Sequence, residues 1–139
     1  MKAKELFKDI PMLERQIAAK KERVIALKHM AENCSPNLSG MPHNPSKSVS
    51  PMADCLCKAI DLEQEIRSDI IRLEEKKVNL INLISTLSNT DFQIILLKRY
   101  FEHCSWNEIS MTTHLSESRL FNLHRQAMAA LDEVIAESQ

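Results

Sequence analysis

Glycine, aromatic residues and long apolar runs are scarce in this chain of 139 residues. It contains one Gly, one Trp, one Tyr and four Phe, while charged residues make up 27% of the chain. A glycine-rich phosphate-binding loop is therefore absent, and few turns can rely on glycine. The abundance of Leu, Ile, Lys and Glu instead favours an all-helical protein.

Membrane-spanning and secretory segments are not expected. No apolar run approaches the roughly 20 residues that a membrane-spanning helix needs. The first ten residues, MKAKELFKDI, lack the apolar core of a signal peptide. We therefore expect a cytoplasmic protein with no membrane partner, whose four cysteines stay reduced.

Charge is distributed unevenly although the net charge is only −1. Residues 1–33 carry eight Lys or Arg and five Asp or Glu, whereas residues 88–139 carry four and seven. Residues 116–126 contain Arg119 and Arg125 against Glu117 alone. The acidic C-terminal part thus includes a short segment that is locally basic, as a phosphate-contacting helix requires.

Cysteine and histidine spacing does not predict a metal site. Cys55 and Cys57 form a C-x-C pair, and Cys34, His29 and His43 lie in or near the segment between the long helices, but the spacing fits no zinc pattern. On a helix, residues 55 and 57 point about 200° apart. We expect no metal and no cofactor.

A row of carboxylates is the other feature that suggests chemistry. Asp61, Glu65 and Asp69 share one helix face, as a metal-dependent nuclease would require, but Arg72, Lys76 and Lys77 follow directly. A solvated face of ion pairs is the expected interpretation. No nucleophile and base are paired in the sequence, so we expect no enzymatic activity.

The N-terminal residues predict a helix over about 3–33. Its apolar positions follow the 4-3 spacing of a heptad seam, with Lys20 at the one missing place: Leu6, Ile10, Leu13, Ile17, Val24, Leu27 and Ala31. Pro11 either kinks this helix or separates a first turn from a main helix that starts at Asp9.

A mobile linker rich in Ser and Pro is predicted over residues 34–50, followed by a helix that starts at Ser50-Pro51 and runs to about Leu87. Its expected seam has Glu63 and Lys77 as polar interruptions and contains Met52, Leu56, Ala59, Ile66, Ile70, Leu73, Leu80, Ile84 and Leu87. A second apolar row contains Ile60, Ile71, Val78 and Ile81. We expect an antiparallel coiled-coil hairpin that associates into a homodimer or higher oligomer, because one partner helix would not cover both rows.

Three shorter helices are predicted to follow. Thr90 is the expected cap of the first, with Gln93 in the capping-box position, and the others span 106–113 and 117–136. The segment from Trp106 to Arg125, WNEISMTTHLSESRLFNLHR, has the pattern of a helix-turn-helix. Ser105 and Glu108 form a capping box, Ser116 starts the next helix, and a small core is expected from Ile109, Leu115, Leu120 and Leu123.

This C-terminal part resembles region 4 of sigma-70-type RNA polymerase subunits. The resemblance is carried by LKRYF at 97–101, SWNEIS at 105–110, LSESRL at 115–120 and LHRQAM at 123–128. Small phage and prophage proteins of this group place such a module behind a helical hairpin. The resemblance implies a three-helix DNA-binding module in a bacterial host cell.

The sequence departs from the family pattern at three places. Ser110 replaces a small alanine, Thr113 replaces a leucine before the turn, and His114 replaces the turn glycine. We predict that His114 adopts the left-handed backbone conformation that glycine usually supplies there.

The resemblance, with the chemistry of the side chains, predicts a DNA-binding set on the helix that begins at Glu117. Asn122 would read adenine, Glu117 would accept from cytosine, and Phe121 would contact a thymine methyl group, while arginines would contact phosphate or base. The complete set is Ser116, Glu117, Ser118, Arg119, Phe121, Asn122, Arg125 and Gln126.

The expected architecture is thus a coiled-coil hairpin over residues 1–87 and a helix-turn-helix module over residues 88–139. The expected function is sequence-specific regulation of transcription through double-stranded DNA, with RNA polymerase as a further partner. Two alternatives remain open: a DNA-packaging adaptor similar to a small terminase subunit, and an interaction protein that docks on RNA polymerase.

Overall fold

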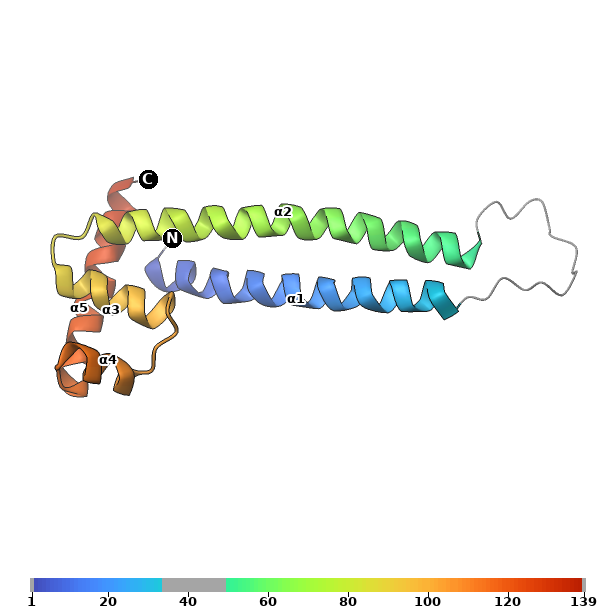
Figure 1. The fold of residues 1–139 in the computed structure, drawn as a ribbon. Helices are drawn as coiled ribbons and strands as arrows, with labels where there is room; N and C mark the ends of the chain where they lie inside the picture. The colour runs from blue at the N-terminus through green and yellow to red at the C-terminus, as the bar shows by residue number, and fades with distance from the viewer. Residues whose placement is uncertain (1, 34–49, 139) are drawn as a thin grey trace, which may run out of the picture. The chain divides into compact units, whose positions relative to one another are not determined.

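The computed structural model describes residues 2–33 and 50–138 and places five α-helices in them (Figure 1). The helices are α1 (Ala3–Asn33), α2 (Pro51–Ser85), α3 (Thr90–Tyr100), α4 (Trp106–Thr113) and α5 (Glu117–Ser138). No strand occurs among the described residues, which confirms the all-helical class. Apart from Ser50, the predicted linker at 34–50 lies outside the described residues. Within the described part of the chain, no helix is long and apolar enough to cross a membrane.

The two long helices start and end close to the predicted residues. α1 continues through Pro11, so a separate helix that starts at Asp9 is not formed. Ser50 caps α2 as expected, because its hydroxyl accepts a hydrogen bond of 3.1 Å from the Ala53 amide. α2 ends at Ser85, earlier than the predicted Leu87.

The described residues fall into two compact units. Residues 12–33 and 50–73 form what we call the hairpin unit, and residues 2–11 and 74–138 form the C-terminal unit. The N-terminal residues of α1 and the end of α2 therefore belong with the three shorter helices. The division of the chain into one domain over residues 1–87 and another over residues 88–139 stays a prediction.

In the hairpin unit, α1 and α2 run antiparallel. Lys20 pairs with Glu65 at 3.6 Å, and Lys28 pairs with Glu63 at 2.7 Å, so higher residue numbers on α1 face lower numbers on α2. Burial corrects the predicted seam of α2. Ala59, Ile66 and Leu73 are buried as expected, but the alternate seam positions lie one residue earlier than predicted, at Cys55, Leu62 and Asp69. Met52, Leu56 and Ile70, which we expected in the seam, are exposed.

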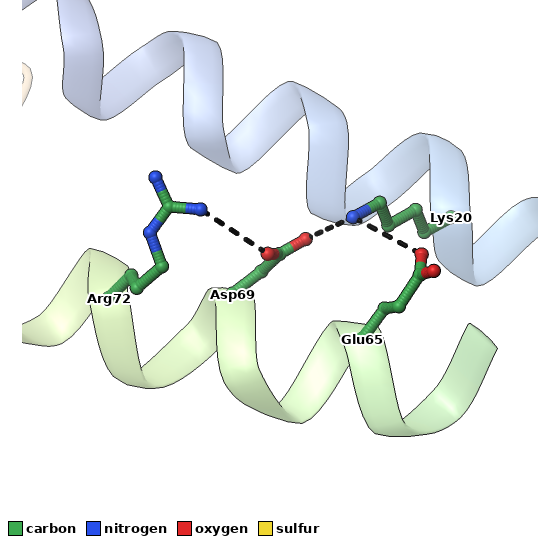
Figure 2. A network of polar contacts seen from close by, with 4 residues as sticks. All are labelled: Lys20, Glu65, Asp69 and Arg72. Carbon is green, nitrogen blue, oxygen red and sulfur yellow. Dashed lines mark hydrogen bonds and ion pairs between the residues drawn. The ribbon is translucent and has the colours of Figure 1, made fainter. Parts of the chain in front are cut away.

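An ion pair therefore occupies the seam between the two helices. Lys20, the polar interruption of the α1 seam, places its Nζ atom 2.5 Å from an Asp69 carboxylate oxygen, and Arg72 lies 3.9 Å from the other oxygen (Figure 2). Asp69 is only 8% exposed, so the expected solvated carboxylate face is wrong at this residue. The Asp69 hydrogen bond is the largest cause that raises the pKa of Lys20 above its ordinary value, although desolvation opposes it.

The C-terminal unit joins the start of α1 to the three shorter helices. The Ala3 amide donates a 2.7 Å hydrogen bond to the Asp132 carboxylate, which stabilises the N-terminus of α1. Phe7, one turn further on, stacks on the ring of Tyr100 in α3 with a centroid distance of 3.9 Å. These contacts make the first turns of α1 part of the unit that contains the predicted site.

The cap of α3 differs from the prediction. Asn89, not Thr90, is the N-cap, and its side-chain oxygen accepts a 2.9 Å hydrogen bond from the Asp91 amide. Gln93 does not complete a capping box. Its side-chain amide donates 2.6 Å and 3.4 Å hydrogen bonds to the carbonyls of Leu87 and Ser85, so it fixes the end of α2 instead.

Candidate nucleic-acid interface

The first helix of the candidate interface, α4, begins with the predicted capping box. The Ser105 hydroxyl accepts from the Glu108 amide at 3.2 Å, and the Glu108 carboxylate accepts from the Ser105 amide at 3.1 Å. Both exposed backbone donors are satisfied, so this helix of eight residues has a well-defined start.

The turn between α4 and α5 follows the predicted geometry. His114 has φ 60° and ψ 27°, so the expected left-handed conformation is confirmed. The Ser110 hydroxyl donates a 2.5 Å hydrogen bond to the Leu115 carbonyl, which connects α4 to the turn. The serine hydroxyl thus adds a polar contact that an alanine at this position would lack.

Four buried side chains fix the crossing of α3, α4 and α5: Ile95, Ile109, Leu120 and Leu123. Trp106 and Leu115 pack against them and remain partly exposed, as does Cys104 before α4. Three of the four predicted core residues are thereby confirmed, the fourth, Leu115, lies at the edge of the core, and α3 contributes Ile95. Such a core sets the angle of the second helix, which a groove-reading helix requires.

A layer of aromatic and cationic groups surrounds Trp106. The Arg99 guanidinium carbon lies 4.8 Å from the centre of the Trp106 ring, and Arg99 also donates a 3.1 Å hydrogen bond to the Cys104 carbonyl. His124 and Phe121 both approach the same indole edge-on, each with a centroid distance of 5.1 Å. Trp106 therefore anchors the start of α5 to α3 and α4.

Tyr100 and His124 form a half-buried polar pair within this layer. The Tyr100 hydroxyl lies 2.8 Å from the His124 Nε2 atom. Burial lowers the pKa of His124 below its ordinary value, and the positive charge of Arg99 lowers it further. Burial also raises the pKa of Tyr100. At neutral pH both groups are uncharged, so α3 and α5 are joined by a neutral hydrogen bond.

All eight residues of the predicted DNA-binding set are exposed. They surround the buried positions Leu120, Leu123 and Ala127, so the first turns of α5 present one outer surface that is polar except for Phe121. Ser116 is the one whose hydroxyl is already used, because it accepts a 3.2 Å hydrogen bond from the Arg119 amide and caps α5. Phe121 is 45% exposed even though its ring contacts Trp106.

Charge on this outer surface is available for a ligand. Arg119 and Arg125 are exposed and make no ion pair with another described residue. Arg99, by contrast, is held by Trp106 and the Cys104 carbonyl. One of the acidic residues near the C-terminus, Asp132, is bound to the Ala3 amide.

Several contacts of the site were not predicted from the sequence. The Tyr100–His124 pair, the Arg99–Trp106 contact and the stacking of Phe7 on Tyr100 all join residues from different helices. The Tyr100–His124 pair could have been suspected from the sequence, because the polar residue His124 lies next to the apolar positions 123 and 127. The described residues also include no group of three His, Cys, Asp or Glu side chains arranged for a metal ion.

The described residues form an all-helical protein in which two long helices are followed by three shorter ones, with a tight turn between α4 and α5. Residues 51–132 match the sequence profile of a family described as "Protein of unknown function (DUF1492)", and the chain belongs to this family. The match extends from the start of α2 into α5, so it includes the entire candidate interface. Neither a curated protein nor a solved structure shows significant similarity to the chain.

Proposed function

We propose that the protein is a sequence-specific DNA-binding regulator of transcription, of phage or prophage type, which reads double-stranded DNA with the first turns of α5. One observation carries the proposal: α5 and the Ser116 that precedes it expose the entire predicted set, while the core of α3, α4 and α5 fixes the direction of α5. Exposed Asn, Ser and Arg side chains on a helix that follows a tight turn are suited to the major groove.

Individual roles follow from side-chain chemistry. Asn122 reads adenine through two hydrogen bonds, and Glu117 accepts from the amino group of cytosine. Arg119 and Arg125 bind phosphate or base edges, because neither is neutralised by a described carboxylate. Phe121 offers an apolar edge to a thymine methyl group, and its contact with Trp106 limits its motion.

The protein is proposed to act as a homodimer formed by the long helices. Apolar side chains of α2 that the hairpin leaves exposed support association: Met52, Leu56, Ile60, Ile70, Ile71, Val78 and Ile81. Two copies of α5 in one dimer bind a single DNA molecule with higher affinity than one copy, because the second α5 binds DNA as an intramolecular step.

Binding by the full chain to DNA selected from a random pool tests the proposal. Arg125→Ala should weaken binding to all sequences and reduce the slope of log affinity against log salt by about one. Asn122→Ala should cost about 1–3 kcal/mol on the selected sequence and relax the preference at one position. Arg23→Ala and Asn82→Ala are matched controls, since both residues are exposed on the long helices. Affinity and preference that neither site variant changes would refute the proposal.

Docking on RNA polymerase is a second candidate, favoured by the acidic balance of residues 88–139, which carry four Lys or Arg and seven Asp or Glu. The negative charge of residues 88–139 is repelled by DNA phosphates. A protein surface that is not negatively charged does not repel it in this way. Capture of RNA polymerase from nuclease-treated lysate by the wild-type chain distinguishes this function, because the treatment removes association through DNA. A ring of eight or more subunits in solution would instead favour the DNA-packaging adaptor.

A further inference from the structure

The two flanks of the α2 seam differ in the hairpin unit. The residues directly before the buried seam positions are polar: Asp54, Lys58, Asp61, Glu65, Ser68 and Arg72. The residues directly after them, within the same unit, include three apolar and two charged side chains: Leu56, Ile60, Glu63, Arg67 and Ile70. Only the second flank therefore offers apolar surface for a further contact.

Apolar exposure on this second flank is substantial. Ile60 is 55% exposed, Ile71, about three turns further along α2, is 59% exposed, and Ile25 of α1, beside Glu63 and Arg67, is 68% exposed. Between the helices lies a groove of about 430 Å³, lined by Lys21, Val24, Ile25, Glu63, Ile66 and Arg67. Branched aliphatic side chains exposed to this extent lose favourable burial unless another surface covers them.

One row of side chains on this flank can pair with the same row on a second, antiparallel copy of α2. The row consists of Ile60, Glu63, Arg67 and Ile70. Its spacing is three, four and three residues, so reading it backwards exchanges the two isoleucines and exchanges the acid with the base. In an antiparallel contact about a two-fold axis, each Ile60 faces the partner's Ile70 and each Glu63 faces the partner's Arg67. We infer that this flank of α2, with Ile25 beside it, is the surface on which a second copy of the chain docks.

Contacts within the chain leave this arrangement available. Glu63 uses one oxygen on Lys28 at 2.7 Å, and that hydrogen bond is the main cause that lowers its pKa. The carboxylate thus stays ionised and keeps an oxygen for a second cation. Arg67 is exposed and makes no ion pair within 4 Å with another described residue, although its charge also lowers the pKa of Glu63, one turn earlier on α2. A parallel contact in the same register would instead oppose like charges, which disfavours it.

This inference rests on the homodimer proposed above but not on DNA binding, and DNA-free mass measurements test it. The wild-type full chain should sediment at micromolar concentration with twice the monomer mass of 15.9 kDa. Arg67→Glu should weaken the dimer at least about tenfold, because each Glu63 then faces a second carboxylate in place of the guanidinium group. Arg23→Glu makes the same charge change on the opposite side of the hairpin and should leave the mass at the wild-type value.

Charge exchange separates this docking surface from a general loss of stability. Arg67→Glu and Glu63→Arg chains should each be weak dimers alone and should form a mixed dimer when combined, because both facing pairs are then opposite in charge. The double variant should regain the wild-type mass. Helicity by circular dichroism checks that each variant folds, and Ile60→Asn replaces any charge variant that loses helicity, again with loss of the dimer expected.

Three results would overturn the inference. The first is a wild-type chain that stays monomeric at micromolar concentration. The second is an Arg67→Glu chain that dimerises as strongly as wild type. The third is a mixture of the two single variants that associates no better than either alone.

Discussion

Positive backbone φ angles occur at His103 and His114, two non-glycine positions of the described chain. The second was predictable, because His114 stands where the resembled family has its turn glycine. The first was not predicted from the sequence. There the Cys104 amide donates to the Lys98 carbonyl at 2.9 Å, and the chain must reverse within a few residues.

His114→Gly should stabilise the protein. A side chain in the left-handed conformation costs roughly 1 kcal/mol, which glycine avoids, although glycine loses more backbone entropy on folding. We expect a net gain of about 0.5 kcal/mol and a melting temperature higher by a few degrees. Thermal unfolding followed by circular dichroism measures the change.

His114→Val is the matched comparison, since a β-branched residue tolerates positive φ poorly and should lower the melting temperature. A glycine variant that melts below the wild type, or a valine variant that melts above it, would contradict this account of the turn.

The seam of α2 shows that the spacing of apolar residues alone does not decide which face of a helix is buried. Two adjacent rows of α2 are apolar, so the 4-3 spacing alone does not say which row faces α1. Contact between the helices selects Leu62 and Asp69 for the inside and leaves Leu56 and Ile70 outside. The position of Asp69 follows from Lys20, because a cation in the α1 seam requires an acidic partner across it.

The Lys20–Asp69 pair should determine the alignment of α1 against α2 and contribute little to the free energy of unfolding. Asp69→Leu should lower the melting temperature, because it leaves the Lys20 ammonium without its nearest partner in a partly buried seam. Lys20→Met combined with Asp69→Leu should melt at or above the wild type, since an apolar seam carries no desolvation penalty.

Melting curves of the single and double variants under identical conditions decide between these expectations. A double variant that is less stable than Asp69→Leu would mean that the seam requires the ion pair for stability itself.

At the scale of the whole molecule, one prediction combines DNA binding by α5 with dimerisation through α2. If two reading helices act together, Arg67→Glu should lower the affinity for a selected DNA with two half-sites at least about tenfold, because the effective concentration of the second module is lost. Affinity for a single half-site should change little. Titration of both DNA molecules at fixed salt measures the difference.

Arg23→Glu provides the control for this prediction, because it removes the same positive charge on the opposite side of the hairpin unit. Equal losses from Arg67→Glu and Arg23→Glu would point to long-range electrostatics rather than to dimerisation.

The sequence by itself determined the all-helical class, the starts of α2 and α4, and the left-handed turn at His114. These features depend on neighbouring residues, through caps, prolines and a resembled motif, so local physics is sufficient. Tertiary structure decided which row of α2 is buried and that Phe7 and Ala3 join the C-terminal unit. Each of these depends on contacts between residues far apart in the chain, where several arrangements satisfy the same pattern and only packing selects one.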